Sequence, residues 1–122
     1  MNTATAITLD NFQQILLEDS KETFILVQFW VPESQACTEM TQLLAGITGK
    51  YNDVMMYTQV NCNEQQQIAS QFGIKSLPTV MLVKDGQPVD GFAGMIHEDK
   101  LHLVEETLLH HLGKTAEILV FL

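Results

Sequence analysis

The apolar residues of this chain recur at two spacings, and each spacing predicts a different kind of element. Steps of three and four residues are typical of amphipathic helices and predict four of them. These helices span residues 10–19, 34–50, 64–72 and 98–112. Continuous or alternating apolar runs predict strands over 23–30 and 53–61 and a hairpin over 78–94. The hairpin turn is Asp85-Gly86, a dipeptide that tolerates a positive φ.

The helix expected over 34–50 decides where the first cysteine lies. Its apolar stripe consists of Cys37, Met40, Leu44, Ile47 and Tyr51. Cys37 is therefore expected to face the core, and free cysteine is among the most buried residue types. Ser34 stands at the start of the helix, where its hydroxyl can accept the backbone N–H of Ala36 or Cys37 as an N-cap.

The order of the elements predicts an α/β fold in a single domain. Helices alternate with strands and with the hairpin, which favours a mixed sheet packed against helices. A chain of 122 residues, 46% of them hydrophobic, suits one domain with its own core. We assign residues 1–112 to this domain. The apolar tail, 113–122, is expected to be the start of a missing continuation or a contact with a partner.

The charge of the chain narrows the choice of partners. Fifteen acidic residues against six lysines, with no arginine, give a net charge of −9. Such a chain has no basic surface for phosphates, so nucleic acids and anionic membranes are poor partners. No apolar run reaches membrane-spanning length, and the first ten residues lack the features of a signal peptide. We therefore expect a cytoplasmic protein.

The sequence predicts neither a metal site nor a cofactor. Cys37 and Cys62 are too few for a disulfide scaffold and wrongly spaced for zinc, so both are expected as thiols in a reducing compartment. His102, Glu106 and His110 fall four residues apart, but no second set of ligands is near in sequence. These three residues are expected to lie on the protein surface and to bind no metal.

Three features of the sequence point to a known family: the order of the elements, the helix that begins three residues before Cys37, and the segment "GIKSLPTV", in which Pro78 precedes a strand. In these features the chain resembles the thioredoxins over nearly its whole length. Thioredoxins carry Trp-Cys-Gly-Pro-Cys where this chain has Glu33, Ser34, Gln35, Ala36 and Cys37. Three segments carry a closer likeness within that superfamily: "SQAC", "NCNEQQQIASQFGIKSLPTV" and "DGQPVDGFAG". In these segments the chain looks like the amino-terminal domain of the chaperedoxins, the YbbN-like co-chaperones. The resemblance implies a thioredoxin fold, a mixed sheet flanked by helices on both faces.

The resemblance also implies that the dithiol chemistry of thioredoxins is absent. That chemistry needs an attacking thiolate and a second thiol that resolves the mixed disulfide, and Ser34 occupies the attacking position. Thioredoxins place a buried acid and a lysine where this chain has Gln28 and Gln59, so the pair that moves protons for the buried thiol is neutral here. We expect a domain without redox turnover.

Cys62 is the candidate for a reactive thiol. It stands at the carboxyl end of the second predicted strand, an edge at which α/β folds bind ligands, and partial exposure is expected there. In the chaperedoxins the matching cysteine is implicated in mixed disulfides with client proteins. An unreactive strand-end cysteine remains the alternative, because no neighbouring cation in the sequence lowers its pKa. A disulfide between Cys37 and Cys62 is not expected.

Pro78 marks a second candidate surface. In thioredoxins the bond that corresponds to Leu77-Pro78 is cis, which leaves the Leu77 backbone as an open edge for an extended peptide. An apolar rim that binds clients is expected around this edge, formed by Leu77, Pro78, Phe92 and Ala93 together with Ala36. The alternative is that these side chains simply close the end of the sheet.

Two functions follow from these residues. The first is a redox-retired protein-binding module of the co-chaperone or holdase type. It would capture unfolded or oxidised client proteins through Cys62 and hand them to chaperone machinery such as a chaperonin. The second is a monothiol oxidoreductase that acts on protein or glutathione disulfides through Cys62 or Cys37. We expect the first, and turnover with glutathione or a thioredoxin reductase system distinguishes the two. A scaffold that only anchors a missing repeat region is a third alternative.

Overall fold

The computed structural model describes residues 4–94, 106–107 and 110–111, which form a five-stranded mixed sheet with flanking helices. The strands are β1 (Thr5–Ala6), β2 (Phe24–Trp30), β3 (Met55–Asn61), β4 (Thr79–Lys84) and β5 (Gln87–Ala93). They lie in the order β1-β3-β2-β4-β5. β3 pairs in parallel with β1 and β2, whereas β4 pairs antiparallel with β2 and β5.

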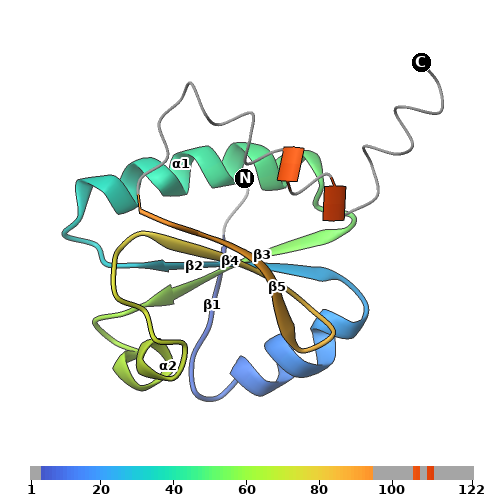
Figure 1. Cartoon of the computed structure of the whole chain (residues 1–122), viewed down its shortest axis with the longest axis horizontal. Helices are drawn as coiled ribbons and strands as arrows, with labels where there is room; N and C mark the ends of the chain where they lie inside the picture. Colours follow the sequence, from blue (N-terminus) through green and yellow to red (C-terminus); the bar gives the residue numbers. More distant parts are fainter. Residues whose placement is uncertain (1–3, 95–105, 108–109, 112–122) are drawn as a thin grey trace.

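Helices cover both faces of this sheet (Figure 1). The long helix α1 (Gln35–Lys50) lies on one face. The other face carries η1 (Gln14–Glu18), η2 (Asp19–Lys21) and α2 (Gln66–Gln71). The predicted α/β class and the mixed sheet flanked on both faces are therefore confirmed.

Each face of the sheet has its own hydrophobic cluster. The cluster under α1 consists of Leu26, Met40, Leu44, Ile47, Met55, Tyr57, Val80 and Leu82. The cluster on the opposite face consists of Ile7, Ile15, Leu16, Ile25, Val27, Phe29, Val60, Ile68 and Val83. Strand β2 contributes to both clusters, because alternate side chains point to opposite faces. Its sequence is therefore apolar without alternation, as in strands buried on both sides.

Two local predictions are confirmed in detail. Helix α1 begins directly after Ser34 and buries four residues of the predicted stripe, Cys37, Met40, Leu44 and Ile47, with Cys37 fully inaccessible to solvent. Tyr51, the fifth, follows the helix and is half-buried. At the hairpin between β4 and β5, Asp85 has φ 54° and Gly86 has φ 75°, the paired positive angles that a tight two-residue turn requires.

The first helix is less regular than its apolar spacing predicts. Where a single helix over 10–19 was expected, η1 has π-helical bonding and η2 is a 3-10 turn that extends to Lys21. The reason is a tertiary contact at Ser20, which is fully buried. Its hydroxyl donates to the Leu16 carbonyl at 2.7 Å and accepts the Gly86 N–H at 2.8 Å. The helix end is thereby fixed to the β4–β5 turn.

The end of the chain is described only in part. Residues 106–107 and 110–111 are helical, and His111 Nε2 lies 2.9 Å from Asp90 Oδ2 on β5. The rest of the helix expected over 98–112, including His102, and the tail 113–122 lie outside the described residues. Among the residues that the structure describes, no helix is long and apolar enough to cross a membrane.

Candidate functional site

The candidate site lies where the carboxyl ends of β2 and β3 meet the start of α1. Ser34 adopts an extended backbone conformation there, and its Oγ accepts the Cys37 backbone N–H at 3.2 Å. This is the N-cap that the sequence predicts. The hydroxyl is thereby used as a hydrogen-bond acceptor in the helix start. An alkoxide at Ser34 would need an adjacent base near neutral pH, and none of its hydrogen bonds among the described residues provides one.

Cys37, in the first turn of α1, is held in the interior. Its side chain has no exposed surface. Its backbone carbonyl accepts two hydrogen bonds, from Gln28 Nε2 at 3.2 Å and from Thr41 Oγ1 at 3.0 Å. The thiol is therefore inaccessible to a bulky disulfide in the folded state, because exchange requires in-line contact between sulfurs.

The two glutamines, Gln28 and Gln59, lie side by side on the sheet. Gln28 and Gln59 are register partners on β2 and β3, and Gln59 Nε2 donates to Gln28 Oε1 at 3.0 Å. The Tyr57 hydroxyl donates to the same oxygen, and the Thr41 hydroxyl accepts from Gln28 Nε2 at 2.9 Å. Burial raises the pKa of Tyr57, which keeps it neutral. We name these four residues the amide network; it connects β2, β3 and α1 without a formal charge.

Sequence reasoning missed two members of the amide network. Tyr57 lies two residues before Gln59, so both side chains point to the same face of β3. Thr41 lies four residues after Cys37, one helical turn along α1. The strand period of two and the helical step of four were the only signals in the sequence that could have placed Tyr57 and Thr41 in the network. They become informative only when the pairing of β2 with β3 is known.

Cys62 directly follows β3 at the same edge of the sheet and is only partly buried. Its backbone N–H donates to the Trp30 carbonyl at 2.8 Å, so it stays in register with the end of β2. Burial raises the pKa of the Cys62 thiol, the hydrogen bond from the backbone near Trp30 lowers it, and the nearby Cys37 raises it again. Both cysteines are free thiols, as expected.

The Leu77-Pro78 peptide bond is cis, as the resemblance implied. Pro78 is buried, Leu77 and Phe92 are half-buried, and Ala93 is exposed. Leu77 and Phe92 each pack against one of the two hydrophobic clusters, so part of their surface serves the core. No hydrogen bond among the described residues involves the Leu77 backbone. Client binding at this rim stays a prediction.

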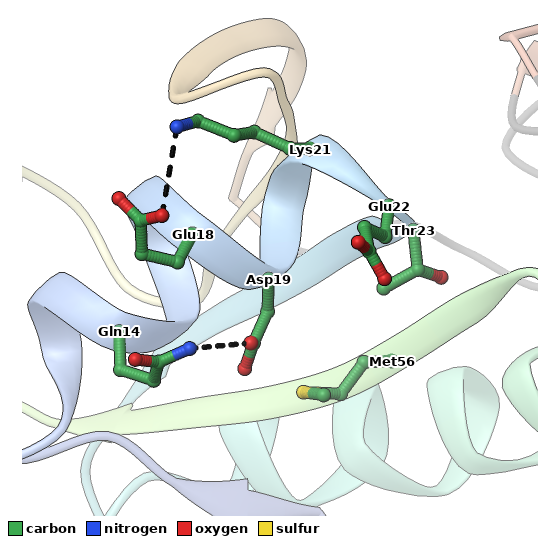
Figure 2. A pocket seen from close by; sticks show the side chains of 7 residues that line it. All are labelled: Gln14, Glu18, Asp19, Lys21, Glu22, Thr23 and Met56. Carbon is green, nitrogen blue, oxygen red and sulfur yellow. Dashed lines mark hydrogen bonds and ion pairs between the residues drawn. The ribbon is translucent and has the colours of Figure 1, made fainter.

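Among the described residues, two cavities are lined by neither cysteine. One of about 350 Å³ lies over the amide network and is lined by Trp30, Thr38, Thr41, Gln42 and Gln59. The other, of about 700 Å³, is lined by Gln14, Glu18, Asp19, Lys21, Glu22, Thr23 and Met56 (Figure 2). In the larger one, four of the polar side chains bond one another, with Glu18 paired to Lys21 and Gln14 to Asp19. In the described part of the chain, no group of three or more histidine, cysteine or acidic side chains could hold a metal.

Comparisons with known proteins identify the fold and the relatives of this chain. A sequence model of the family described as Thioredoxin matches residues 3–106. "Thioredoxin 1" of Synechococcus elongatus is 38% identical over 101 residues, which cover 83% of this chain and 92% of that protein. "Thioredoxin 1" of a Nostoc species is 34% identical over 112 residues, which cover 92% of this chain and all of the relative.

A solved structure supports the same fold. The thioredoxin of Malassezia sympodialis superposes with a TM-score of 0.74 at 24% identity and covers 88% of this chain and 91% of that one. The thioredoxin fold expected from the sequence is therefore confirmed.

The same relatives correct the expected function. The sequence favoured a redox-retired client-binding module of the co-chaperone type, yet the relatives are named thioredoxins. That expectation is wrong, because the substitutions at Ser34, Gln28 and Gln59 were read as the loss of redox activity altogether. The second hypothesis, a monothiol oxidoreductase, is better supported by these relatives.

Proposed function

The chain belongs to the thioredoxin family, and on that premise we propose that it is a thiol–disulfide oxidoreductase that works through one accessible thiol, Cys62. The observation that carries this proposal is the difference in access between the two cysteines. Cys62 is partly exposed at the edge where β2, β3 and α1 meet, whereas Cys37 has no exposed surface. The finer resemblance to the amino-terminal domain of the chaperedoxins also favours Cys62 as the exchanging residue.

The reaction needs one protein thiol and a second thiol from solution. The Cys62 thiolate attacks one sulfur of a disulfide, the Cys62–substrate bond forms, the substrate S–S bond breaks, and the leaving thiolate takes a proton from water. A low-molecular-weight thiol such as glutathione then attacks the mixed disulfide. This second step forms a disulfide between the incoming thiol and the substrate fragment and returns the Cys62 thiol. Ser34 has no part in resolution, because a hydroxyl does not exchange with disulfides.

The environment of Cys62 predicts slow chemistry at neutral pH. Its raised pKa lowers the thiolate fraction, and the thiolate is the nucleophile. A thiol of higher pKa is more nucleophilic once it is ionised, which recovers part of the rate. We therefore propose a slow exchange catalyst rather than a fast dithiol reductase.

The proposed substrates are protein disulfides and low-molecular-weight disulfides, with oxidised client proteins among them. The Leu77 backbone offers a free hydrogen-bonding edge for an extended segment of such a protein, and Phe92 and Ala93 add apolar surface beside it. A cytoplasmic location suits this chemistry, because a glutathione pool supplies the resolving thiol. With a net charge of −9, nucleic acids and anionic membranes remain unsuitable partners.

Turnover of hydroxyethyl disulfide with reduced glutathione, coupled to glutathione reductase and NADPH, tests the proposal. The wild-type protein should exceed the uncatalysed rate, and Cys62→Ser should return it to background. Cys37→Ala is the matched control, since it removes the other thiol and should retain most of the rate. Full activity in Cys62→Ser, or a wild type indistinguishable from background, would overturn the proposal.

A further inference from the structure

A hydrogen-bonded carboxylate lies near the proposed reactive thiol. The Asn63 side-chain amide donates to both oxygens of Glu33, at 3.0 Å to Oε1 and 2.9 Å to Oε2. Glu33 lies in the loop before α1, and Asn63 is the residue after Cys62. Both side chains are exposed. The contact therefore connects the two loops that border the thiol.

The backbone around this contact is also fixed. Asn61 Oδ1 accepts the N–H groups of Asn63 and Glu64, at 3.0 and 3.3 Å, and the Asn61 carbonyl accepts the Gln65 N–H at 2.8 Å. Cys62 lies inside this turn. Asn63 is one Cα step of about 3.8 Å from Cys62, and its amide bonds Glu33, so the Glu33 carboxylate lies within a distance on the order of 10 Å of the thiol. That separation exceeds the Debye length of about 8 Å at physiological salt, so the effect of Glu33 on an approaching substrate is strongest at low ionic strength.

The partner of Glu33 holds the carboxylate in place without cancelling its charge. A lysine or arginine in place of Asn63 would neutralise the carboxylate, whereas an amide is a neutral donor. Glu64, also exposed, adds a second negative charge to the same turn. The loop after α2 carries one positive charge, on Lys75. A substrate that approaches Cys62 therefore meets an oriented negative charge within a chain of net charge −9.

We propose that Glu33 is a specificity-determining residue that makes Cys62 select disulfides flanked by cationic groups over disulfides flanked by anionic groups. The inference rests on the proposed exchange function. It names the substrate class, a disulfide near lysine or arginine side chains or another ammonium group. Attraction concentrates such substrates at the thiol, and repulsion lowers the encounter rate of carboxylate-bearing disulfides.

Three small disulfides separate charge from other effects. Cystamine carries two ammonium groups, hydroxyethyl disulfide is neutral, and dithiodiglycolate carries two carboxylates. Each reacts with the native protein in a single step, in which the Cys62–S–S–R bond forms and RS⁻ leaves. The rate at which the Cys62 adduct forms is measured by mass spectrometry at low ionic strength. Intrinsic differences among the disulfides cancel when the ratio of cystamine to dithiodiglycolate rates is compared between variants.

Glu33→Gln should lower this ratio about threefold at low salt, with the neutral disulfide affected least. Glu22→Gln is the matched control: it removes one negative charge at the opposite end of the sheet, where β2 begins, and should leave the ratio unchanged. Salt near 1 M should shrink the difference between wild type and Glu33→Gln.

An unchanged ratio in Glu33→Gln overturns the inference, and so does an equal fall in Glu22→Gln, which would indicate net charge alone. The absence of any Cys62 adduct with the neutral disulfide in the wild type would instead overturn the proposed function. The two failures are therefore distinguishable.

Discussion

At the scale of single residues, Ser34 and Cys62 have separate tasks. The Ser34 hydroxyl caps α1 by accepting the Cys37 N–H. Cys62 lies at the adjacent strand end with partial exposure. Ser34 therefore serves the start of the helix, and Cys62 is the partly exposed thiol at this edge of the sheet.

The capping role of Ser34 predicts a stability effect without an effect on exchange. Ser34→Ala should lower the free energy of unfolding by about 1 kcal/mol, because one N–H of the first helical turn loses its acceptor. The rate of Cys62 adduct formation should stay within experimental error. Ser34→Asn restores an acceptor and serves as the control in urea unfolding. Loss of exchange in Ser34→Ala would contradict the assignment of Ser34 as a cap.

The pKa of Cys62 predicts a pH profile. Burial raises the pKa of this thiol, so less than half of it should be thiolate at the pH where a free cysteine, with a pKa of about 8.5, is half ionised. Alkylation of Cys62 by iodoacetamide, measured from about pH 6 to 10, should give a midpoint above that of a model thiol. A midpoint at or below the free-thiol value would show that burial does not control this residue.

At the scale of elements, the amide network joins α1 to the two central strands. Gln28 is fully buried, and its side chain bonds Thr41, Gln59, Tyr57 and the Cys37 carbonyl. Every buried side-chain nitrogen and oxygen in the described part of the chain has a hydrogen-bond partner. Such a network stabilises only while it is complete, because a missing member leaves buried groups unpaired.

Gln28→Leu should lower the free energy of unfolding by about 2 to 3 kcal/mol, since it leaves the Tyr57 hydroxyl and the Gln59 amide without their shared acceptor. Gln42→Leu is the control on the same helix. Gln42 is exposed, so its replacement should change stability by no more than about 0.5 kcal/mol. Equal effects of the two substitutions in urea unfolding would contradict a structural role for the network.

The sequence predicted correctly those elements that are specified by residues close together in the chain. The stripe of α1, the continuous apolar run of β2 and the Asp85-Gly86 turn each carry their own signal. The irregular η1 and η2 depend on Ser20, whose partner at Gly86 is 66 residues away in sequence. β1 has only two residues, too few for a period to be detected.

The features of the candidate site also fall into those with a local signal in the sequence and those without one. The Ser34 cap and the burial of Cys37 follow from helix spacing, and the position of Cys62 follows from where its strand ends. Thr41 and Tyr57 were missed because their partners lie across α1, β2 and β3. The contact between Glu33 and Asn63, 30 residues apart, has no local signal either. The function was misjudged because the missing first cysteine was given more weight than the family.

At the scale of the whole molecule, His111 attaches the end of the described chain to the edge strand β5. Its Nε2 lies 2.9 Å from Asp90 Oδ2, and the side chains are 25% and 32% exposed. The hydrogen bond to His111 lowers the pKa of Asp90, with a further contribution from the Gly91 backbone. The edge of the sheet therefore has a pH-dependent connection to the last described helical residues.

This connection predicts acid sensitivity. Because the pKa of Asp90 is lower in the folded than in the unfolded chain, the pair contributes stability above the unfolded pKa and loses it as pH falls through the folded pKa. Asp90→Asn should therefore be less stable than the wild type near about pH 6, and the difference should vanish toward about pH 2 to 3. Urea unfolding across this range measures it. A difference that does not change with pH would contradict the assignment.

The central claim, that exchange proceeds through Cys62, is tested most directly by peptide mapping of the native protein after limited reaction with hydroxyethyl disulfide. The partial exposure of Cys62 and the complete burial of Cys37 predict that the adduct accumulates on Cys62 first. Cys37 should react only when the chain is unfolded in denaturant. An adduct that forms on Cys37 in the native protein as fast as on Cys62, or faster, would contradict the claim.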